Sequence, residues 1–263
     1  MITVIVISVI LILFFLYAHF IGASRLRIRE YYFKDLPCDM ILISDLHFRR
    51  YSGIHRRVYD VLRAYKGIET VICSGDTFEN IGNYEFFDCL EEKDGYFVLG
   101  NNDYGKKNEK ERVDKIEKIF KKRGIRILRN ENIKISENFY VVGIDDPHKE
   151  KEDLEKSFDG IPGGAKVFSV VHSPEANDGI LEYEPDYLFF GHTHGGQVRF
   201  PFIGSVFNNI RRGKVPPLGI CRRGKTTLIH SSGIGTTLLP IRFMNPAEVI
   251  VLRRSDAEHH GHK

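Results

Sequence analysis

Short apolar runs alternate along this chain with stretches in which apolar residues recur at a helical period. Six runs of four or five residues predict buried strands. They lie at 40–44, 70–73, 96–99, 140–144, 167–171 and 187–191. Residues 109–123 place Val113 and Phe120 on one apolar face among lysines and glutamates, which predicts a helix that ends at Gly124. Strand, helix, strand repetition favours right-handed crossovers and a largely parallel sheet.

Near the C-terminal end, residues 226–232 and 247–252 have the apolar pattern of strands but no helix between them. Added to the six earlier runs, they favour two packed sheets flanked by helices, which is a mixed α/β fold. The chain shows no internal repeat, low-complexity tract or linker to a second domain.

The first apolar segment differs from all the others in length. Residues 2–21 contain no Asp, Glu, Lys or Arg, and a helix of about 20 such residues matches the roughly 30 Å of a bilayer core. The segment therefore predicts a transmembrane helix or an uncleaved signal anchor. A cleavable signal is less favoured because no basic residue precedes the segment and no A-x-A sequence follows it. A buried core helix is the remaining alternative.

Arginines follow this segment directly, at Arg25, Arg27 and Arg29. By the positive-inside rule they predict a single-pass protein of the cell membrane with its main domain in the cytoplasm. We expect an anchor at 1–24, a juxtamembrane lead-in at 25–37 and one catalytic domain at 38–253. A flexible tail at 254–263 ends in HHGHK, whose histidines we interpret as incidental.

Composition narrows the function classes. With 263 residues and a net charge of +3, the chain suits one α/β domain and is too weakly basic to imply nucleic acid by itself. Its four cysteines form no C-x-x-C pair, so neither a zinc knuckle nor a redox motif is indicated, and we expect them reduced and mostly structural.

Polar residues that can bind metal follow five of the predicted strands. They are Asp45, His47, Asp76, Glu79, Asn101, Asn102, Asp103, His172, His192 and His194. Because ligands gather beyond the carboxyl ends of strands in open α/β sheets, these side chains are expected to converge. Carboxylate, amide and imidazole ligands suit Mn, Fe, Zn or Mg, and a carboxylate bridging two cations fits this set better than one tetrahedral zinc.

Each motif alone also has an ordinary structural interpretation. Asn101, Asn102 and Asp103 are usual turn residues, and His172 fits a strand-end histidine. The two histidines of GHTHGG lie on opposite sides of an extended chain, so they reach one site only if the backbone turns, which the glycines permit. The ordered combination of motifs carries the specificity.

That ordered set, D-x-H at 45–47, GD-x-x-E at 75–79, GNND at 100–103, His172 and GH-x-H at 191–194, resembles the signature of the calcineurin-like metallophosphoesterases over residues 38–253. GHTHGGQVRFP and the late SSGIGTTLLPIRFMNPAEVIVL are similar to the membrane-associated or exported bacterial phosphodiesterase branch. That branch also resembles a type of UDP-2,3-diacylglucosamine hydrolase. The resemblance implies a four-layer α-β-β-α sandwich of two mixed sheets.

The resemblance also implies two divalent metal ions, of identity Mn, Fe, Zn or Mg, and a ligand set. The first metal would be bound by Asp45, His47 and His194. Asp76 would bridge to the second, whose set is completed by Asn101, His172 and His192. Two nearby cations repel unless an anion lies between them, and a bridging hydroxide would attack phosphorus in line without a covalent intermediate.

Asn102 departs from the family pattern, which often has histidine there, paired with the residue corresponding to Asp103. We expect both residues to be catalytic, with Asn102 donating a hydrogen bond but no proton near neutral pH. Leaving groups that need little protonation would suffer least. The hypothesis is a preference for diesters or pyrophosphates over alkyl monoesters.

A basic and aromatic stretch follows the last motif. From Gly196 to Ser232 the chain has no acidic residue, and Arg199, Arg211 and Arg212 lie among several phenylalanines. A solvated loop is one interpretation. The other is a surface that meets anionic lipid and presents lipid phosphates to the metals, with these arginines binding substrate or membrane.

The expected function is thus a membrane-anchored, metal-dependent phosphoesterase acting on phosphodiester or pyrophosphate bonds, with a lipid-linked phosphoester among the candidate substrates. A nuclease or nucleotide phosphodiesterase is the main alternative, because a basic loop beside two metals also suits a phosphate backbone. The anchor argues against nucleic acid. A non-catalytic scaffold of the same fold would be expected to lose metal ligands, and all seven positions are filled.

Overall fold

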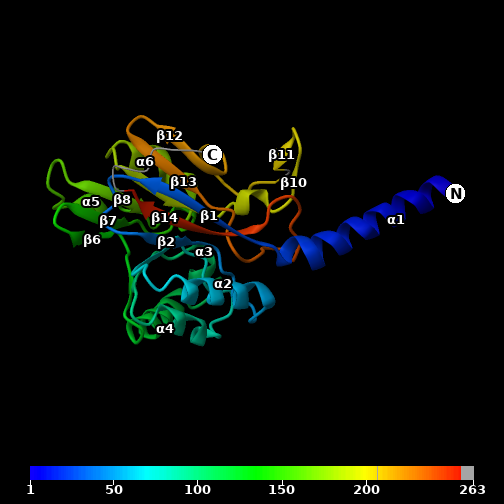
Figure 1. Ribbon diagram of the computed structural model, residues 1–263, viewed down its shortest axis with the longest axis horizontal. Coiled ribbons are helices and arrows are strands. Elements are labelled where there is room, and N and C mark those ends of the chain that lie inside the picture. Colours follow the sequence, from blue (N-terminus) through cyan, green and yellow to red (C-terminus); the bar gives the residue numbers. More distant parts are fainter. Residues whose placement is uncertain (206, 256–263) are drawn as a thin grey trace.

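Two six-stranded sheets lie face to face in the computed structural model, which describes residues 1–205 and 207–255 (Figure 1). The first has the order β1 (Leu26–Phe33), β14 (Ala247–Arg254), β2 (Met40–Ile43), β3 (Thr70–Cys73), β4 (Asp94–Phe97), β5 (Ile125–Ile127). The second has the order β12 (Gly219–Arg223), β13 (Thr226–His230), β9 (Tyr187–Phe190), β8 (Lys166–Val170), β7 (Phe139–Gly143), β6 (Glu131–Ser136).

The strands at the centre of each sheet are parallel. β2, β3, β4 and β5 run parallel to one another, as do β13, β9, β8 and β7. Antiparallel strands border them, because β14 pairs with β2, β12 with β13 and β6 with β7 in that sense. Both sheets are therefore mixed, and the carboxyl ends of the parallel strands meet along a common edge.

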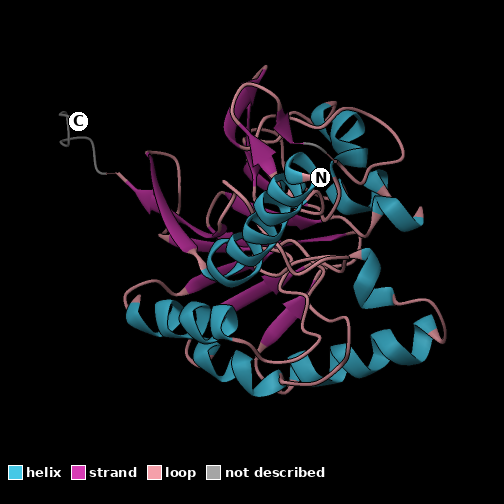
Figure 2. Ribbon diagram, turned by 90° about the vertical axis from the view of Figure 1, so that its right-hand side faces the viewer, coloured by secondary structure: helices cyan, strands magenta, loops and turns pink. Residues whose placement is uncertain are grey.

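Helices cover the outer face of each sheet. Against the first lie α2 (Gly53–Ala64), α4 (Glu109–Lys121) and a 3₁₀ segment at Tyr84–Leu90. Against the second lie α5 (Leu154–Phe158) and α6 (Asn177–Leu181). The short α3 (Asn101–Tyr104) follows β4, and a small hairpin is formed by β10 (Arg199–Phe200) and β11 (Gly204–Ser205). Figure 2 shows the strands between helices on either side, which confirms the four-layer α-β-β-α sandwich.

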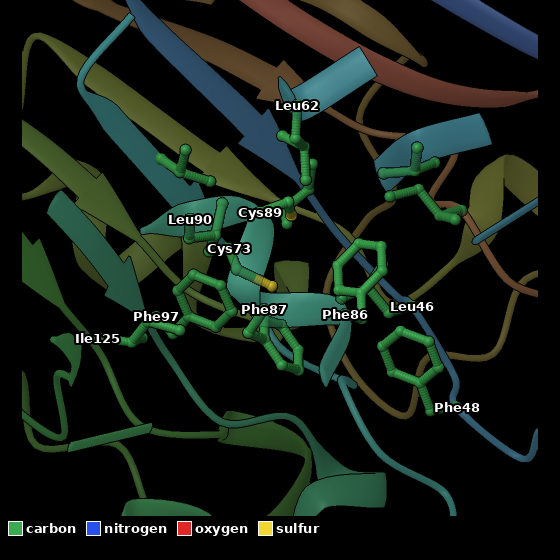
Figure 3. Close-up of a cluster of buried hydrophobic side chains, with 14 of the residues drawn as sticks. Leu46, Phe48, Leu62, Cys73, Phe86, Phe87, Cys89, Leu90, Phe97 and Ile125 are labelled. Atoms are coloured by element: carbon green, nitrogen blue, oxygen red, sulfur yellow. The ribbon is translucent and has the colours of Figure 1, made fainter. Parts of the chain in front are cut away.

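Alternation along the strands divides the apolar core into layers. In β2, Ile41 and Ile43 point to the helices, whereas Met40 and Leu42 lie between the sheets. The helix-side layer of the first sheet is rich in aromatic rings, and Figure 3 shows part of this cluster around Phe87. The ring centroids of Phe87 and Phe120 lie 4.9 Å apart in an edge-on arrangement that aromatic pairs favour. Burial on both faces explains why the strands are continuous apolar runs.

The predicted elements are present, with small shifts. The helix predicted at 109–123 is Glu109–Lys121, and Gly124 adopts a positive φ of 72° after it. The strand predicted at 96–99 begins earlier, at Asp94. The apolar patterns did not predict β5, β6 or β12. They also did not predict β1, which runs parallel to β14 as an edge strand within the lead-in.

The N-terminal segment projects from the body as a helix, α1 (Ile2–Leu16), continued by π and 3₁₀ turns to Ser24 (Figure 1). The 23 residues from Ile2 to Ser24 are long and apolar enough to cross a membrane, and a signal sequence has the same features. The second half of this segment meets the body, where Phe14 packs on Phe243 and where Ala18 and Gly22 are buried. The HHGHK tail lies outside the described residues.

Candidate metal centre

Five neighbouring strand ends bring the predicted metal ligands together. Asp45 and His47 follow β2, Asp76 follows β3, Asn101 follows β4, His172 follows β8, and His192 and His194 follow β9. Six of the seven fall into two clusters, in each of which the candidate ligand atoms lie within 4.8 Å of one another. The clusters are Asp45 with His47 and His194, and Asp76 with His172 and His192. All six are buried.

In the first cluster, two imidazoles and one carboxylate face one point. Nε2 of His47 lies 2.9 Å from Nε2 of His194, and Oδ1 of Asp45 lies 3.8 Å and 3.5 Å from these two nitrogens. On the opposite edge of the His47 ring, Nδ1 donates to Oε1 of Glu79 at 3.0 Å. That bond fixes the tautomer and leaves the Nε2 lone pair of His47 directed into the cluster.

The second cluster gives the stronger geometric argument for a cation. Nδ1 of His172 donates to the carbonyl of Ser74 at 2.8 Å, and Nε2 of His192 donates to the carbonyl of Asn209 at 2.5 Å. These bonds leave lone pairs on Nε2 of His172 and Nδ1 of His192, which lie only 3.0 Å apart. Two acceptors facing each other repel unless a proton or a cation lies with them. The donor set is therefore that of a metal site.

Asp76 joins the two clusters. Its Oδ2 lies 3.4 Å from Nε2 of His47, and its Oδ1 lies 3.4 Å from Nε2 of His172. One oxygen thus faces each cluster, as a bridging carboxylate requires. On the loop after β4, Oδ1 of Asn101 is buried and has no hydrogen-bond partner among the described residues, which is costly for a polar atom. An amide oxygen left bare at this edge fits a seventh ligand.

The carboxylates of the two clusters affect the pKa values of the neighbouring imidazoles. Burial opposes charge on His47, but Asp45, Glu79 and Asp76 outweigh it and raise its pKa to about 9. Burial likewise opposes charge on His172, yet Asp76 raises its pKa to about 10. Burial, together with the neighbouring imidazolium, lowers the pKa of His192 to about 4. Burial lowers the pKa of His194, the partner of His47, to about 3, so each imidazole pair holds one positive charge.

The backbone is strained where these ligands lie. Five of them have left-handed φ angles that residues other than glycine rarely adopt. They are Asp45, His47, Asp76, His192 and His194. Gly191 permits the close packing around them, since a Cβ there would collide with Oγ of Ser44 and a carboxylate oxygen of Asp45. Such strain concentrates at functional sites, where the surrounding structure holds it in place.

The structure places Asn102 and Asp103 on the loops that carry the ligands. Asn102 donates twice to Asp76, from its backbone N–H at 2.8 Å and from Nδ2 at 2.6 Å. Asp103 is fully buried and accepts from the backbone N–H groups of Thr77, Phe78 and Gly100. It therefore joins the loop after β3 to the loop after β4. A catalytic role for either residue stays a prediction.

Arg242 was not among the predicted site residues, although it is fully buried beside the first cluster. Its guanidinium donates to the carbonyls of Ser232, Gly233 and Gly235, and Nη2 lies 3.4 Å from Nδ1 of His194. Burial lowers its pKa to about 10. Arg242 thus holds the C-terminal loop against the residues that surround Asp45 and His47.

Three further residues adjoin the second cluster and were also missed. Nδ1 of His148 donates to Oε1 of the nearly buried Glu175 at 2.9 Å, and the rings of His148 and His192 lie 4.7 Å apart. Oδ2 of Asp146 is buried without a partner. A signal for this group was present, because Asp145 and Asp146 directly follow the predicted strand at 140–144, as polar residues follow the other strands.

The predicted basic residues lie on the loop that leaves His194. Nη1 of Arg199 donates to the carbonyl of Gly195 at 3.0 Å. Arg211 donates to the carbonyl of His148, and Arg212 forms an ion pair with Glu152. Both arginines remain exposed at the surface. The loop therefore borders the second cluster, and its role toward substrate or membrane stays a prediction.

This fold and donor set define a metal-dependent hydrolase of the two-sheet sandwich class, and the comparison with known families agrees. The profile described as Calcineurin-like phosphoesterase superfamily domain matches residues 39–200. The chain belongs to the calcineurin-like phosphoesterase superfamily, whose members are hydrolases that use divalent metals.

Curated relatives share parts of this domain. YpbG of Bacillus subtilis (strain 168), an uncharacterized protein, is 33% identical over 153 residues, which are 56% of this chain and 52% of YpbG. The uncharacterized metallophosphoesterase YkoQ of the same organism is 23% identical over 226 residues, 80% of this chain and 81% of YkoQ. UDP-2,3-diacylglucosamine pyrophosphatase LpxG of Chlamydia muridarum is 26% identical over 137 residues, 48% of this chain and 40% of LpxG. The match thus spans about half of YpbG and less of LpxG.

Proposed function

We propose that this protein is a membrane-anchored phosphoesterase that uses two divalent metal ions to hydrolyse a phosphodiester or pyrophosphate bond of a lipid-linked substrate. The observation that carries the proposal is Asp76, whose two carboxylate oxygens face two separate ligand clusters. When bound, two such cations activate a water nucleophile and neutralise charge on the phosphoryl oxygens.

The residues of this chain have separate parts in that proposal. Asp45, His47 and His194 would hold the first ion, and Asn101, His172 and His192 the second, with Asp76 shared. Glu79 and the carbonyls of Ser74 and Asn209 orient three of the imidazoles. Asn102 would donate a hydrogen bond near the leaving oxygen but supplies no proton, which favours leaving groups that depart as anions.

The substrate class rests on two supports. The apolar segment at Ile2–Ser24 is long enough to cross a bilayer, so the centre would lie beside lipid. LpxG, whose name describes a pyrophosphatase of a diacylated sugar nucleotide, is similar over about half of this chain. Arginines after the anchor favour a cytoplasmic domain under the positive-inside rule. The nucleic-acid alternative is less supported, because an anchor at Ile2–Ser24 would hold the centre at a membrane.

Metal analysis and a substrate panel on the full chain in detergent test the proposal. We expect two divalent ions per chain and faster hydrolysis of an aryl diester or a nucleoside-diphosphate lipid than of an alkyl monoester. Asp76→Asn should lose metal and reduce activity by at least about 100-fold, since even partners outside the ligand shell cost 10- to 100-fold.

The exposed Asp178→Asn is the matched control for Asp76→Asn and should retain both properties. A wild-type chain that binds fewer than two ions, or that prefers the alkyl monoester, would contradict the proposal.

A further inference from the structure

An exposed apolar patch lies beside the base of α1. It comprises Phe202 and Ile203 at the turn of the β10–β11 hairpin and Leu238, Leu239 and Met244 on the loop before β14. Ile203 is 76% exposed and Leu238 is 73% exposed, and Phe202 is exposed completely. Exposed apolar side chains grouped in this way mark a surface that meets a partner or a membrane.

The two segments of this patch form one unit with the end of the N-terminal segment. Arg199 donates to the carbonyl of Phe243 at 3.0 Å, which joins the hairpin to the loop before β14. The ring of Phe14 in α1 lies 5.0 Å from that of Phe243 and 6.3 Å from that of Phe200. The N–H of Arg242 donates to the carbonyl of Ala18 at 3.0 Å. The patch and the base of α1 therefore share a fixed relative position.

Figure 1 shows the arrangement along the molecule. The β10–β11 hairpin lies at the end of the body from which α1 projects, and α1 continues beyond it in one direction. A bilayer that receives α1 must therefore meet the body at the end that carries the hairpin. The patch extends the apolar surface of α1 sideways, so the bilayer that receives α1 also covers the patch.

The charge of the sequence segment that carries the patch suits the same occupant. From Gly196 to Ala247 the sequence contains no Asp or Glu, while Arg199, Arg211, Arg212 and Lys214 are basic. Aromatic and aliphatic side chains bordered by basic residues are typical of segments that lie in the headgroup region of an anionic leaflet. A protein partner would need no such absence of acidic residues.

We infer that this patch is embedded in the bilayer interface next to α1. The inference rests on the anchored function proposed above and adds a second point of membrane contact. The hairpin begins five residues after His194, and Gln197 bonds to Thr237 in both directions. Docking of the patch therefore fixes the metal centre close to the lipid surface, where a lipid-linked phosphate reaches it without leaving the bilayer.

The chain contains no tryptophan, so a single introduced tryptophan reports on one position without background. Three full-length variants are reconstituted separately into vesicles of phosphatidylcholine and phosphatidylglycerol with brominated acyl chains. Phe202→Trp tests the patch, Phe15→Trp tests insertion of α1, and Tyr183→Trp is an exposed aromatic control near α6. We expect strong quenching and blue-shifted emission for Phe202→Trp and Phe15→Trp, and aqueous emission for Tyr183→Trp.

Adding Ile203→Asp and Leu238→Asp to Phe202→Trp should return its emission to that of the Tyr183→Trp control, because carboxylates are excluded from the bilayer. Quenching of Phe15→Trp without quenching of Phe202→Trp would overturn the inference and leave the anchor intact. If neither is quenched, the anchored function fails as well. Blue-shifted emission of Phe202→Trp that brominated lipid does not quench would mean that a second copy or another protein covers the patch, which also overturns it. Quenching requires no turnover, so a chain inactive on every substrate still gives a decisive result.

Discussion

The hydrogen bond at the far edge of each imidazole determines which ring nitrogen faces the metal cluster. His47 presents Nε2 to the first cluster because Glu79 accepts from its Nδ1, and His172 presents Nε2 because the carbonyl of Ser74 does the same. Asn101 differs in that no group of the described residues donates to its buried Oδ1. A polar atom kept bare in the interior is explained when a ligand completes it.

Removing that oxygen tests its role. Asn101→Ala should reduce the metal content from two ions per chain to one and weaken affinity for the second ion by at least about tenfold. Asn101→Asp retains an oxygen and should retain both ions. Elemental analysis and metal titration measure the effect. Asn138→Ala, on an exposed turn, is the control. Two ions in Asn101→Ala would show that the bare oxygen is not a ligand.

The neighbouring position tests the leaving-group hypothesis. Asn102→His introduces a group that can protonate a leaving oxygen, and general acid catalysis contributes about 10²- to 10⁴-fold when the group is well placed. The backbone N–H that donates to Asp76 remains. We expect the ratio of kcat/KM for an alkyl monoester to that for an aryl diester to rise by roughly tenfold or more. A ratio unchanged in a variant that keeps both metals would mean that Asn102 does not limit the leaving group.

At the scale of elements, the strands of this fold are easier to predict from the sequence than the loops that follow them. The central strands follow from apolar runs, because burial on both faces leaves a continuous signal. The short or outer strands β5, β6 and β12 had no predicted run. β1 escaped prediction because its sequence, LRIREYYF, mixes charged and apolar residues, as an edge strand with a solvated side permits. Its pairing with β14, some two hundred residues away in sequence, depends on the completed sheet.

The site was predictable to the extent that residues lie at strand ends within short motifs. Arg242 and Glu175 lie in no such motif, and only tertiary packing brings them to the clusters. His148 follows a predicted strand but was not singled out, because the signal of a lone histidine is weak. The strained backbone at His192 and His194 was anticipated only as a turn that glycine permits.

Substitution of Gly191 tests how tightly the loops that carry the metal ligands pack against one another. Gly191→Ala places a methyl group onto Ser44 and Asp45, and overpacking of this kind costs about 1–3 kcal/mol or more. We expect a fall in Tm of roughly 2–4 °C per kcal/mol, together with weaker metal binding. Gly163→Ala meets no atom within 4 Å and should leave Tm unchanged or slightly higher. Equal Tm values for the two variants would show that the loop after β9 can relax.

At the scale of the whole molecule, the N-terminal segment divides into a free part and a packed part. The described residues of α1 up to Leu13 are exposed, whereas Ala18 and Gly22 are buried against the loop before β14. A Cβ at Gly22 would collide with the carbonyl of Arg242. The end of this segment is thus part of the same packed body that holds Arg242 beside His194.

Two truncations separate these parts. Removal of residues 1–12 should leave Tm and metal content in detergent unchanged, because those side chains contact nothing that stabilises the body. Removal of residues 1–24 exposes Phe243 and takes the acceptor at Ala18 from the N–H of Arg242, a loss of about 1–3 kcal/mol for a group left unsatisfied. Because Arg242 also lies 3.4 Å from His194, metal affinity should fall with Tm in the longer truncation. Thermal unfolding with and without chelator measures both properties. If the two truncated chains unfold at the same temperature and retain the same metal content, the base of α1 does not stabilise the domain. The anchor and the metal centre would then be energetically independent.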